Sequence, residues 1–419
     1  MEVKMTPLDG MEVRGKRVLL RLDINSPIDP QTKQIVNENR LKKSLPTLRY
    51  LLEGGAKVAI IAHQGDTLDY QNLIPLKEHA AKLTALSGRE VNYIDDVCGP
   101  AACAAIQALG EGACILLGNL RYLCEEISGF EKEVKLKPSE MLDTWLVRTL
   151  TPLFDLYVND AFSAAHRNCP SMTAFQEVLP TAAGFLLFDE YKALYNVLHG
   201  AKKPAVFVLG GAKISDAFGM MEAVCANGTA DTILACGVTG QVMLLAKGVR
   251  LGKTTEDFLK ARDLWCFVDQ AKDLLSRFPD VFELPADLAF ERDGKRVELD
   301  VEALPVEEAF CDLGAKTIEA YRGIIARAGT IFANGPAGVY ENPLFEAGTR
   351  AIWSAVAGAP GYSVIGGGDT VSSATKLADI QKINYVCTAG GAMVRFMSGK
   401  KLALVAAMEG AYARAQTGA

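Results

Sequence analysis

Charged and amide side chains recur in the first half of the sequence, each a few residues after a short apolar run. An arginine fork binds phosphate or carboxylate through paired hydrogen bonds. Several arginines in corresponding positions favour a site for one small anion over unrelated surface salt bridges. For His63 and His166, a role in ligand binding and a structural hydrogen bond are equally compatible with the sequence. The residues concerned are Arg21, Asp23, Asn25, His63, Gln64, Asn119, Arg121, Asn159, Asp160, His166 and Arg167.

Glycine turns dominate the corresponding positions of the second half. A glycine turn that opens a helix exposes backbone N–H groups, which bind phosphate at the helix N-terminus. Several such turns in one half favour a site for a polyphosphate and its metal over ordinary tight turns. Asp369 follows three glycines, where it fits either ligation of magnesium or capping of the next helix. The turns comprise residues 210–213, 237, 334–336, 366–370 and 389–391.

Several familiar catalytic motifs are absent from the sequence. The segment GVRLGKTT, residues 248–255, has three residues between its glycines where a Walker A loop requires four, so we interpret it as an ordinary loop. No G-x-G-x-x-G follows an apolar run, which argues against a dinucleotide-dependent dehydrogenase. G-x-S-x-G, H-E-x-x-H and C-x-x-C are also missing.

The elements that would position these side chains alternate between strand and helix. Near-continuous apolar runs predict parallel strands buried on both faces, at residues 17–24, 57–62, 91–94, 114–117, 156–159, 205–209, 232–235, 330–333 and 363–365. Helical patterns lie between them, for example at 39–53, 76–87 and 257–278, and the alternating charges of 287–300 predict an exposed hairpin. Ligands of such sheets bind beyond the carboxyl ends of the strands. The pattern predicts an α/β protein of two doubly wound, parallel-sheet (Rossmann-like) domains, 1–183 and 184–399, joined by a hinge helix within 179–200.

Composition excludes several classes of protein. A chain of 419 residues with 49% apolar and 22% charged residues is not a disordered chain, and a net charge of −6 argues against a nucleic-acid partner. The ten cysteines show no zinc spacing and fit reduced thiols in a cytoplasmic protein. The first residues lack the apolar core of a signal peptide, and the uncharged stretch 351–368 is broken by Pro360 and glycines. We therefore expect no membrane association.

Eight segments, taken in order, resemble phosphoglycerate kinases, in the form of the archaeal branch. They are RLDINSP, AHQG, GNLRY, NDAFSAAHR, LGGAKISD, ANGPAGVYE, GGGDT and TAGGA, and they extend over essentially the whole chain. The resemblance implies reversible phosphoryl transfer between 1,3-bisphosphoglycerate with MgADP and 3-phosphoglycerate with MgATP. It also implies a monomeric two-domain hinge enzyme whose last segment, about 400–419, packs back onto the first domain.

The resemblance also implies roles for single residues. The phosphoglycerate would be held by the first domain, through Asp23, Asn25, Arg40, His63, Arg121, His166 and Arg167. The nucleotide would be held by Gly211, Ala212, Lys213, Asn334, Glu341, Gly366, Gly367, Gly368, Asp369 and Thr370, with Asp369 as the ligand of Mg2+. The migrating group would be neutralised by Arg21, Lys213, Gly390 and Gly391. Phosphoryl transfer needs positioning and charge stabilisation, so no catalytic triad is expected.

Four positions depart from the family pattern. Asp66 and Ala217 stand where cations are expected, Ala389 stands where a glycine is expected, and Gly118 stands where a glutamate is expected. The two missing cations leave two alternatives open. One is a kinase of a related small carboxylate, and the other is a non-catalytic nucleotide-binding homologue.

Overall fold

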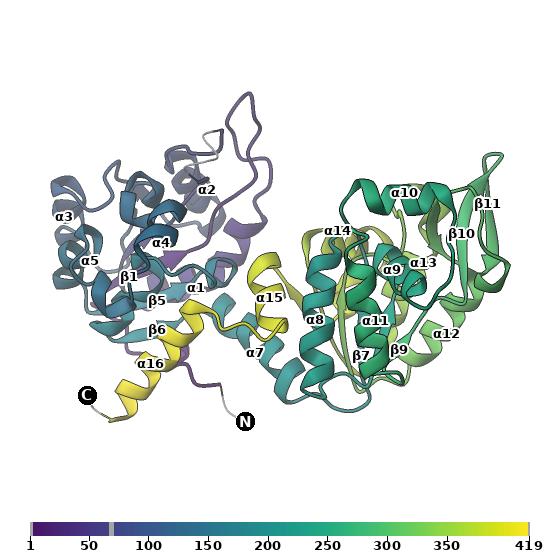
Figure 1. Cartoon of the computed structure of the whole chain (residues 1–419). Helices are drawn as coiled ribbons and strands as arrows, with labels where there is room; N and C mark the ends of the chain where they lie inside the picture. The colour runs from purple at the N-terminus through teal and green to yellow at the C-terminus, as the bar shows by residue number, and fades with distance from the viewer. Residues whose placement is uncertain (1–2, 67–70, 418–419) are drawn as a thin grey trace. The chain divides into compact units, whose positions relative to one another are not determined.

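The computed structural model describes residues 3–66 and 71–417, which form two compact units (Figure 1). The N-terminal unit contains residues up to Lys192 and the segment from Lys401 onward, and the C-terminal unit contains Ala193–Lys400. The division falls inside α7 (Phe185–His199), a continuous helix, rather than at the predicted boundary 183/184 just before it.

A six-stranded parallel sheet forms the centre of the N-terminal unit, in the order β3-β4-β2-β1-β5-β6. Its strands are β1 Arg17–Leu22, β2 Lys57–Ile61, β3 Val91–Tyr93, β4 Cys114–Leu116, β5 Leu156–Asp160 and β6 Thr181–Ala183. The helices around it are α1 Asn39–Glu53, α2 Lys77–Ser87, α3 Pro100–Gln107, α4 Ser128–Val134, α5 Trp145–Leu150 and α6 Pro170–Thr173.

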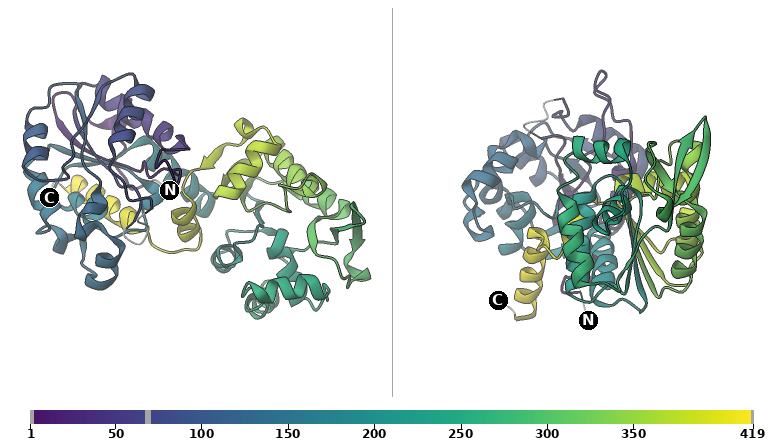
Figure 2. Two further views of the ribbon diagram at one scale, coloured as in Figure 1. Left: turned by 90° about the horizontal axis from the view of Figure 1, so that it is seen from above. Right: turned by 45° about the vertical axis from the view of Figure 1, so that its right-hand side comes forward.

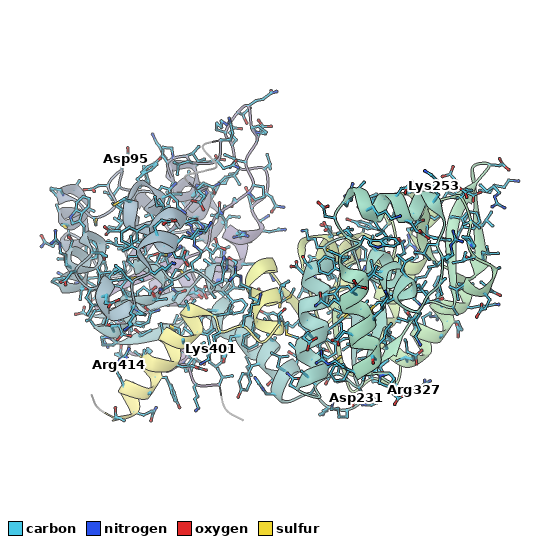
Figure 3. All side chains as sticks on the ribbon, in the orientation of Figure 1. Asp95, Asp231, Lys253, Arg327, Lys401 and Arg414 are labelled. Atoms are coloured by element: carbon cyan, nitrogen blue, oxygen red, sulfur yellow. The ribbon has the colours of Figure 1, made fainter. Side chains whose placement is uncertain are left out.

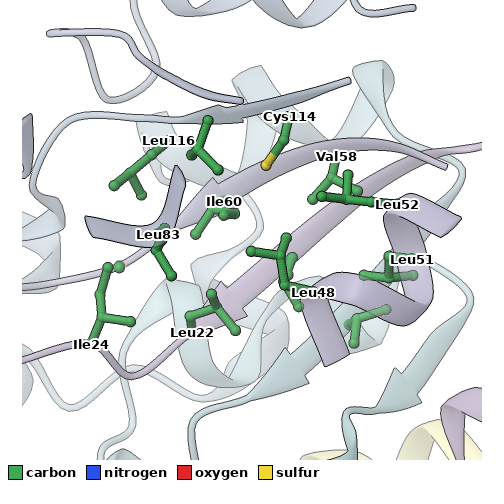
Figure 4. Packing of buried hydrophobic residues seen from close by; sticks show 14 of the residues in the cluster. Leu22, Ile24, Leu48, Leu51, Leu52, Val58, Ile60, Leu83, Cys114 and Leu116 are labelled. Carbon is green, nitrogen blue, oxygen red and sulfur yellow. The ribbon is translucent and has the colours of Figure 1, made fainter. Parts of the chain in front are cut away.

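Alternate residues of β1, β2, β4 and β5 pack into two separate cores. In β2, Val58 and Ile60 join the core beneath α1 and α2, whereas Ala59 and Ile61 join the core with α3 and α5. Figure 4 shows the first of these cores, where Leu48 of α1 lies among the sheet residues. The period of two along a strand therefore buries both faces, as the unbroken apolar runs predict.

The C-terminal unit has a second six-stranded parallel sheet, in the order β15-β14-β13-β7-β8-β9, and an antiparallel sheet β11-β10-β12. The strands are β7 Ala205–Leu209, β8 Thr232–Ala235, β9 Phe282–Glu283, β10 Asp287–Arg292, β11 Lys295–Asp300, β12 Phe310–Leu313, β13 Thr330–Asn334, β14 Tyr362–Gly366 and β15 Tyr385–Cys387. The helices are α8 Ile214–Ala226, α9 Gly237–Ala246, α10 Lys253–Ala261, α11 Phe267–Arg277, α12 Ala315–Ile325, α13 Ala347–Gly358, α14 Gly368–Leu377 and α15 Gly390–Met397. Helices α12, α13 and α14 bury side chains against the parallel sheet. On another side of this unit, α8 contacts both α11 and α15. Figure 2 gives two further views of the ribbon.

The predicted fold class is confirmed, and residues 287–300 form the predicted hairpin from β10 and β11. The prediction that this hairpin is exposed is wrong for the first four residues of β10, Asp287–Phe290, which are buried. The single helix predicted over 257–278 is wrong, because α10 ends at Ala261 and α11 begins at Phe267. Asp263 adopts a left-handed backbone conformation, with φ 56°, which terminates the first helix. Aspartate tolerates this conformation better than most residues, and apolar periodicity gives no sign of it.

The last helix, α16 (Ala403–Thr417), belongs to the N-terminal unit and packs against α6 and β6 (Figure 1). Arg414, labelled in Figure 3, donates to the carbonyl of Gln176 and forms an ion pair with Glu177. These contacts join the end of the chain to the first unit.

A buried carboxyl group lies at the end of β5, where α7 begins. The Asp160 carboxylate accepts from the N–H of Leu187 at 3.0 Å, and its second oxygen has no hydrogen-bond partner among the described residues. Burial, together with the charge of Glu190, raises the pKa of Asp160 to about 7, against opposing hydrogen bonds from the start of α7 and from the side chain of Thr47. Asp160 is therefore a titratable group inside the folded unit.

We expect Asp160→Asn to remove part of the pH dependence of stability. Between about pH 4 and pH 7 the folded chain holds a proton on Asp160 that the unfolded chain has lost, so the free energy of unfolding falls as pH rises through this window. The full effect is up to about 4 kcal/mol for a shift of this size. Urea unfolding measures the free energy of unfolding of the variant and of the parent at pH 5 and at pH 8. The difference, variant minus parent, should be more positive at pH 8 than at pH 5. Asp143→Asn, at an exposed position, is the control. Equal differences at both pH values would contradict the assignment.

Candidate functional site

The N-terminal unit contains a cavity of about 580 Å³ at the carboxyl ends of its strands. Every residue that the resemblance assigns to the phosphoglycerate lines it: Asp23, Asn25, Arg40, His63, Arg121, His166 and Arg167. Four neighbouring strands of the sheet, β4, β2, β1 and β5, supply most of these side chains from the segments that follow them, and Arg121 follows β4. Arg40 comes instead from the start of α1. The lining is rich in cationic groups and hydrogen-bond donors, which suits a small anion.

Arg40 and Asp23 form an ion pair on the wall of the cavity. The guanidinium of Arg40 also donates to the hydroxyl of Ser163, at 3.4 Å. Asn25 accepts from the N–H of Gly65 at 3.1 Å, which ties the segment after β1 to the segment after β2. The polar groups of neighbouring strand ends thus hold one another in place.

Arg21 is completely buried behind His63, although it does not line the cavity itself. One of its terminal nitrogens lies 3.0 Å from Nδ1 of His63, and a guanidinium can only donate. Nδ1 is therefore the acceptor, and the imidazole carries its proton on Nε2. Burial, together with the charges of the surrounding arginines, lowers the pKa of His63 well below its ordinary value. His63 is a neutral donor toward a ligand.

Arg121 is held in place by backbone carbonyl groups. Its guanidinium donates to the carbonyl of Gly65, at 3.3 Å, and to the carbonyl of Glu126. Burial and the charge of Arg167 lower the pKa of Arg121, but an arginine remains charged at neutral pH.

Arg167 is held by two carboxylates. Its Nε donates to Glu131 at 2.8 Å, and its first terminal nitrogen lies 3.6 Å from a carboxylate oxygen of Asp66. Asp66 also accepts from the hydroxyl of Ser128, at 2.5 Å. The second terminal nitrogen of Arg167 is buried and has no hydrogen-bond partner among the described residues. Since buried donors are almost always paired, this one is available to a bound anion. The acidic departure at Asp66 is thus part of the support for an arginine.

The C-terminal unit contains a smaller cavity of about 210 Å³. Four of the residues predicted to bind the nucleotide line it: Gly211, Ala212, Glu341 and Asp369. Lys213 lies beside it, with its amine 3.9 Å from the Asp369 carboxylate, and both side chains are mainly exposed. A cation and a carboxylate at the edge of a partly apolar cavity suit a nucleotide with phosphates and a metal ion.

The remaining predicted nucleotide residues form the turns next to this cavity. Asn334 donates to the carbonyl of Gly366 at 2.7 Å, and the hydroxyl of Thr370 accepts from the N–H of Gly335 at 2.7 Å. Gly367 has φ 102°, and a Cβ there would lie 2.6 Å from the Asn334 amide, so this position requires glycine. Helix α14 begins directly after it, at Gly368.

The first turn of α14 contains the predicted metal ligand. Asp369 lies inside this turn, while Gly367 occupies the capping position, so the alternative that Asp369 merely caps the helix is wrong. The carboxylate is mainly exposed and faces the Lys213 amine.

Gly390 and Gly391 open α15, which follows β15 at the edge of the sheet. They do not line either cavity, and a Cβ at each would meet nothing within 4 Å. The site residues therefore divide between the units, with Arg21 and the cationic cavity in one and the glycine turns in the other.

Two of the other departures, Gly118 and Ala217, have steric explanations. A Cβ at Gly118 would lie 3.1 Å from Val97 and from the backbone of Asp96, so no larger side chain fits without a shift. Ala217 is buried on the inner face of α8, where a lysine would have to enter the core. Ala389 is also buried, at the capping position of α15.

The loop of residues 248–255, which only partly matches a Walker A motif, does not enter either cavity. Its lysine, Lys253, begins α10 and pairs with Asp257 at 2.7 Å (Figure 3). The interpretation as an ordinary loop is consistent with these contacts.

Some residues near the first cavity were not predicted from the sequence as site residues. Ser26, Asn72 and Ser163 line the first cavity, and Glu131 supports Arg167 from α4. Glutamates just after GNLRY were a possible signal for such a supporting role, because buried arginines need carboxylate partners.

Comparison with known proteins agrees with the motifs. The family model described as phosphoglycerate kinase matches residues 8–400. The chain belongs to the phosphoglycerate kinase family. Phosphoglycerate kinases of Methanothermobacter thermautotrophicus and Pyrococcus furiosus are 40% and 38% identical to it, and each match covers 97% of this chain, with 97% and 98% of the relative. The crystal structure of the phosphoglycerate kinase from Pyrococcus horikoshii OT3 matches with a TM-score of 0.86 at 36% identity, over 98% of this chain and all of that one. The phosphoglycerate kinase structure from Coxiella burnetii matches with a TM-score of 0.80 at 29% identity, over 96% and 98%.

Membership of the phosphoglycerate kinase family makes this chain a phosphotransferase of glycolysis. Within the described residues, no helix is long and apolar enough to cross a membrane, and no group of three or more acidic, histidine or cysteine side chains is placed to hold a metal ion.

We expect His63 to stay neutral from pH 5 to pH 8, with its proton on Nε2. Only four histidines are present, so nitrogen-15 NMR of the labelled protein can resolve and assign each of them. The His63 spectrum should show one tautomer and no titration in this range, and His79, whose pKa burial lowers to about 4, should behave similarly. The denatured protein is the control, because there the ordinary midpoint near 6.5 should return. A titration of His63 with a midpoint at or above 6.5 in the folded protein would refute the assigned hydrogen bond.

Proposed function

We propose that this enzyme transfers a phosphoryl group reversibly between 1,3-bisphosphoglycerate with MgADP and 3-phosphoglycerate with MgATP, and that the cationic cavity binds the phosphoglycerate. The observation that carries the proposal is the cavity itself, in which Arg40, Arg121 and Arg167 meet beside the neutral donor His63. The unpartnered nitrogen of Arg167 supports it, because a phosphate oxygen supplies the missing acceptor. In this arrangement Arg40, Arg121, Arg167 and the donor His63 bind the phosphate of the substrate, with His166 beside them.

Asp23 and Asn25 are proposed to bind the hydroxyl and carboxylate region of the phosphoglycerate. Arg40 pairs with Asp23 already, so the carboxylate of Asp23 is oriented before a ligand binds. The Asn25 oxygen is engaged by Gly65, which leaves its N–H2 group as the donor toward a ligand.

The second cavity is the proposed nucleotide site. Gly211 and Ala212 line it, and Glu341 offers acceptor oxygens for ribose hydroxyls. Lys213 would bind the phosphates as a flexible, exposed cation. Asn334 and the N–H groups of Gly366, Gly367, Gly368 and Thr370 would follow the phosphate chain to the start of α14.

Magnesium fits the donors at the start of α14. A nucleotide-bound Mg2+ keeps several waters and takes one or two carboxylates besides the phosphates. Asp369 supplies one such carboxylate, exposed and adjacent to the Lys213 amine. The bound ion would neutralise phosphate charge there.

The chain's own groups perform the transfer by positioning and charge compensation. The carboxylate of 3-phosphoglycerate is already ionised, so no residue has to remove a proton. Arg21 and Lys213 would neutralise the equatorial oxygens of the migrating group, together with the N–H groups of Gly390 and Gly391 at the start of α15. The proposed catalytic groups are therefore two side-chain cations and two backbone N–H groups.

Further expectations complete the proposal. We propose that the protein acts as a monomer in the cytoplasm and that its partners are small molecules rather than nucleic acids. The comparisons give no support to a different acceptor or to a non-catalytic role. Asp66, which motivated the alternative of a kinase of a related carboxylate, is engaged with Ser128 and Arg167.

Arg40→Ala should weaken the use of 3-phosphoglycerate. A charge-assisted hydrogen bond to a ligand contributes about 1.5–3 kcal/mol, so KM for 3-phosphoglycerate should rise by roughly tenfold to a hundredfold, with little change in KM for MgATP. Lys43→Ala removes an exposed charge from the same helix and is the matched control. If steady-state kinetics show the same KM for 3-phosphoglycerate in both variants, Arg40 does not contact the substrate.

Asp369→Ala should weaken binding of MgADP and leave binding of 3-phosphoglycerate unchanged. The variant loses the carboxylate that would hold the ion, so calorimetric affinity for ADP should no longer respond to added magnesium. Asp280→Ala, at an exposed position of the same unit, should retain the response. Undiminished MgADP affinity in the Asp369 variant would remove this residue from the metal site.

A further inference from the structure

Two fully buried polar residues lie behind the cationic cavity and have no role in the proposed reaction. Glu126 and Ser171 are both 0% exposed, and neither lines the cavity. They come from segments 45 residues apart in the sequence. A buried carboxylate is costly unless it is paired or hydrogen-bonded, so its partners indicate what it is for.

The contacts of Glu126 lead to Ser171. One carboxylate oxygen accepts from the N–H of Ser171 at 2.6 Å, and the other accepts from its hydroxyl at 2.7 Å. The thiol of Cys169 lies 3.5 Å from the second oxygen. The serine is thus fixed in position and in the direction of its hydroxyl proton, which points at Glu126.

From Ser171 the chain of contacts continues to the cavity. Its hydroxyl proton is used by Glu126, so the oxygen accepts from Nε of Arg21 at 3.2 Å. A terminal nitrogen of Arg21 then donates to Nδ1 of His63 at 3.0 Å. Arg21 is 1% exposed, and its other terminal nitrogen donates to the carbonyl of Leu22. Each nitrogen of this guanidinium therefore donates one hydrogen bond to the protein, and each terminal nitrogen has a second N–H besides.

Glu126 also contacts a second arginine of the site. Its backbone carbonyl accepts from the guanidinium of Arg121. Glu126 therefore fixes Arg121 directly and Arg21 through Ser171. We call the series Glu126, Ser171, Arg21 and His63 the relay. The carboxylate of Glu126 supplies a buried negative charge behind both arginines. The same relay determines which nitrogen of His63 carries the proton.

We propose that Glu126 and Ser171 are positioning residues for phosphoryl transfer, which act by holding Arg21 in register with His63. This inference rests on the proposed function, in which Arg21 neutralises the migrating group. Displacement of such a group by about 1 Å can lower a rate by a hundredfold. The relay keeps a buried cation at a fixed place without exposing a carboxylate to the anionic substrate.

Ser171→Ala tests the relay. The variant loses the acceptor for Nε of Arg21, so kcat should fall by roughly tenfold to a hundredfold while KM for MgATP stays within about twofold. The nitrogen-15 shift of Nδ1 of His63 should move toward that of an unbonded nitrogen, because Arg21 no longer donates in the same direction. Ser44→Ala removes another buried hydroxyl, one that donates only within α1, and should leave kcat and the His63 shift unchanged. Wild-type kcat together with a wild-type His63 shift in Ser171→Ala would overturn the proposal.

A double-mutant cycle separates positioning from general loss of structure. If Ser171 acts through Arg21, Ser171→Ala should cause no further loss of kcat in an Arg21→Ala background. Multiplicative losses would show that the serine acts elsewhere and would overturn the proposal. Glu126→Gln, which keeps the shape of the side chain, is the second variant and should lower kcat in the same direction. The two claims fail separately. If the wild-type protein is inactive with 3-phosphoglycerate, the proposed function is refuted. The contacts of the relay are still tested in that case, because the NMR measurement requires no turnover.

Discussion

The N-terminal site depends on one constraint, the mutual repulsion of several guanidinium groups that gather around one cavity. Arg21, Arg40, Arg121 and Arg167 all act on the same imidazole, His63. Like charges repel, and burial removes the water that would screen them. Each arginine is accordingly held by acceptors of the protein. Asp23 pairs with Arg40, Glu131 with Arg167, and Glu126 supports Arg21 and Arg121 from behind. The acidic residues in and around the proposed anion site are thus part of what allows the cations to gather there.

The C-terminal unit meets a similar demand in a different way. The phosphate-binding groups proposed for it are mainly backbone N–H groups at helix starts, which carry no net charge and need no counter-ion. Before α14, the Asn334 amide leaves no room for a Cβ at Gly367, whereas the space around Gly390 and Gly391 at the start of α15 is open. The two charged groups, Lys213 and Asp369, remain exposed and face each other. One unit therefore relies on buried charge and the other on backbone dipoles, although both sheets have the same parallel architecture.

Much of the fold and of the candidate site could be predicted from the sequence, because the side chains that bind ligands in parallel sheets follow the strands. Arg21, His63 and Arg167 stood out in this way, whereas Arg40 and Glu341 came only from the family resemblance. Short strands such as β6 and β12 gave no clear pattern, and the break at Asp263 was hidden by continuous apolar periodicity. The support from Ser171 could not be predicted, because it joins side chains 150 residues apart in the case of Arg21. Such contacts depend on tertiary packing, which local patterns do not determine.

A coupled assay of the purified protein with 3-phosphoglycerate and MgATP tests the central claim most directly. The assay follows ADP formation at saturating concentrations of both substrates. The account predicts turnover that depends on 3-phosphoglycerate and saturates with it, at the rate of 1–100 per second that is typical of kinases. The absence of 3-phosphoglycerate-dependent turnover under these conditions, in a protein shown to be folded, would contradict it.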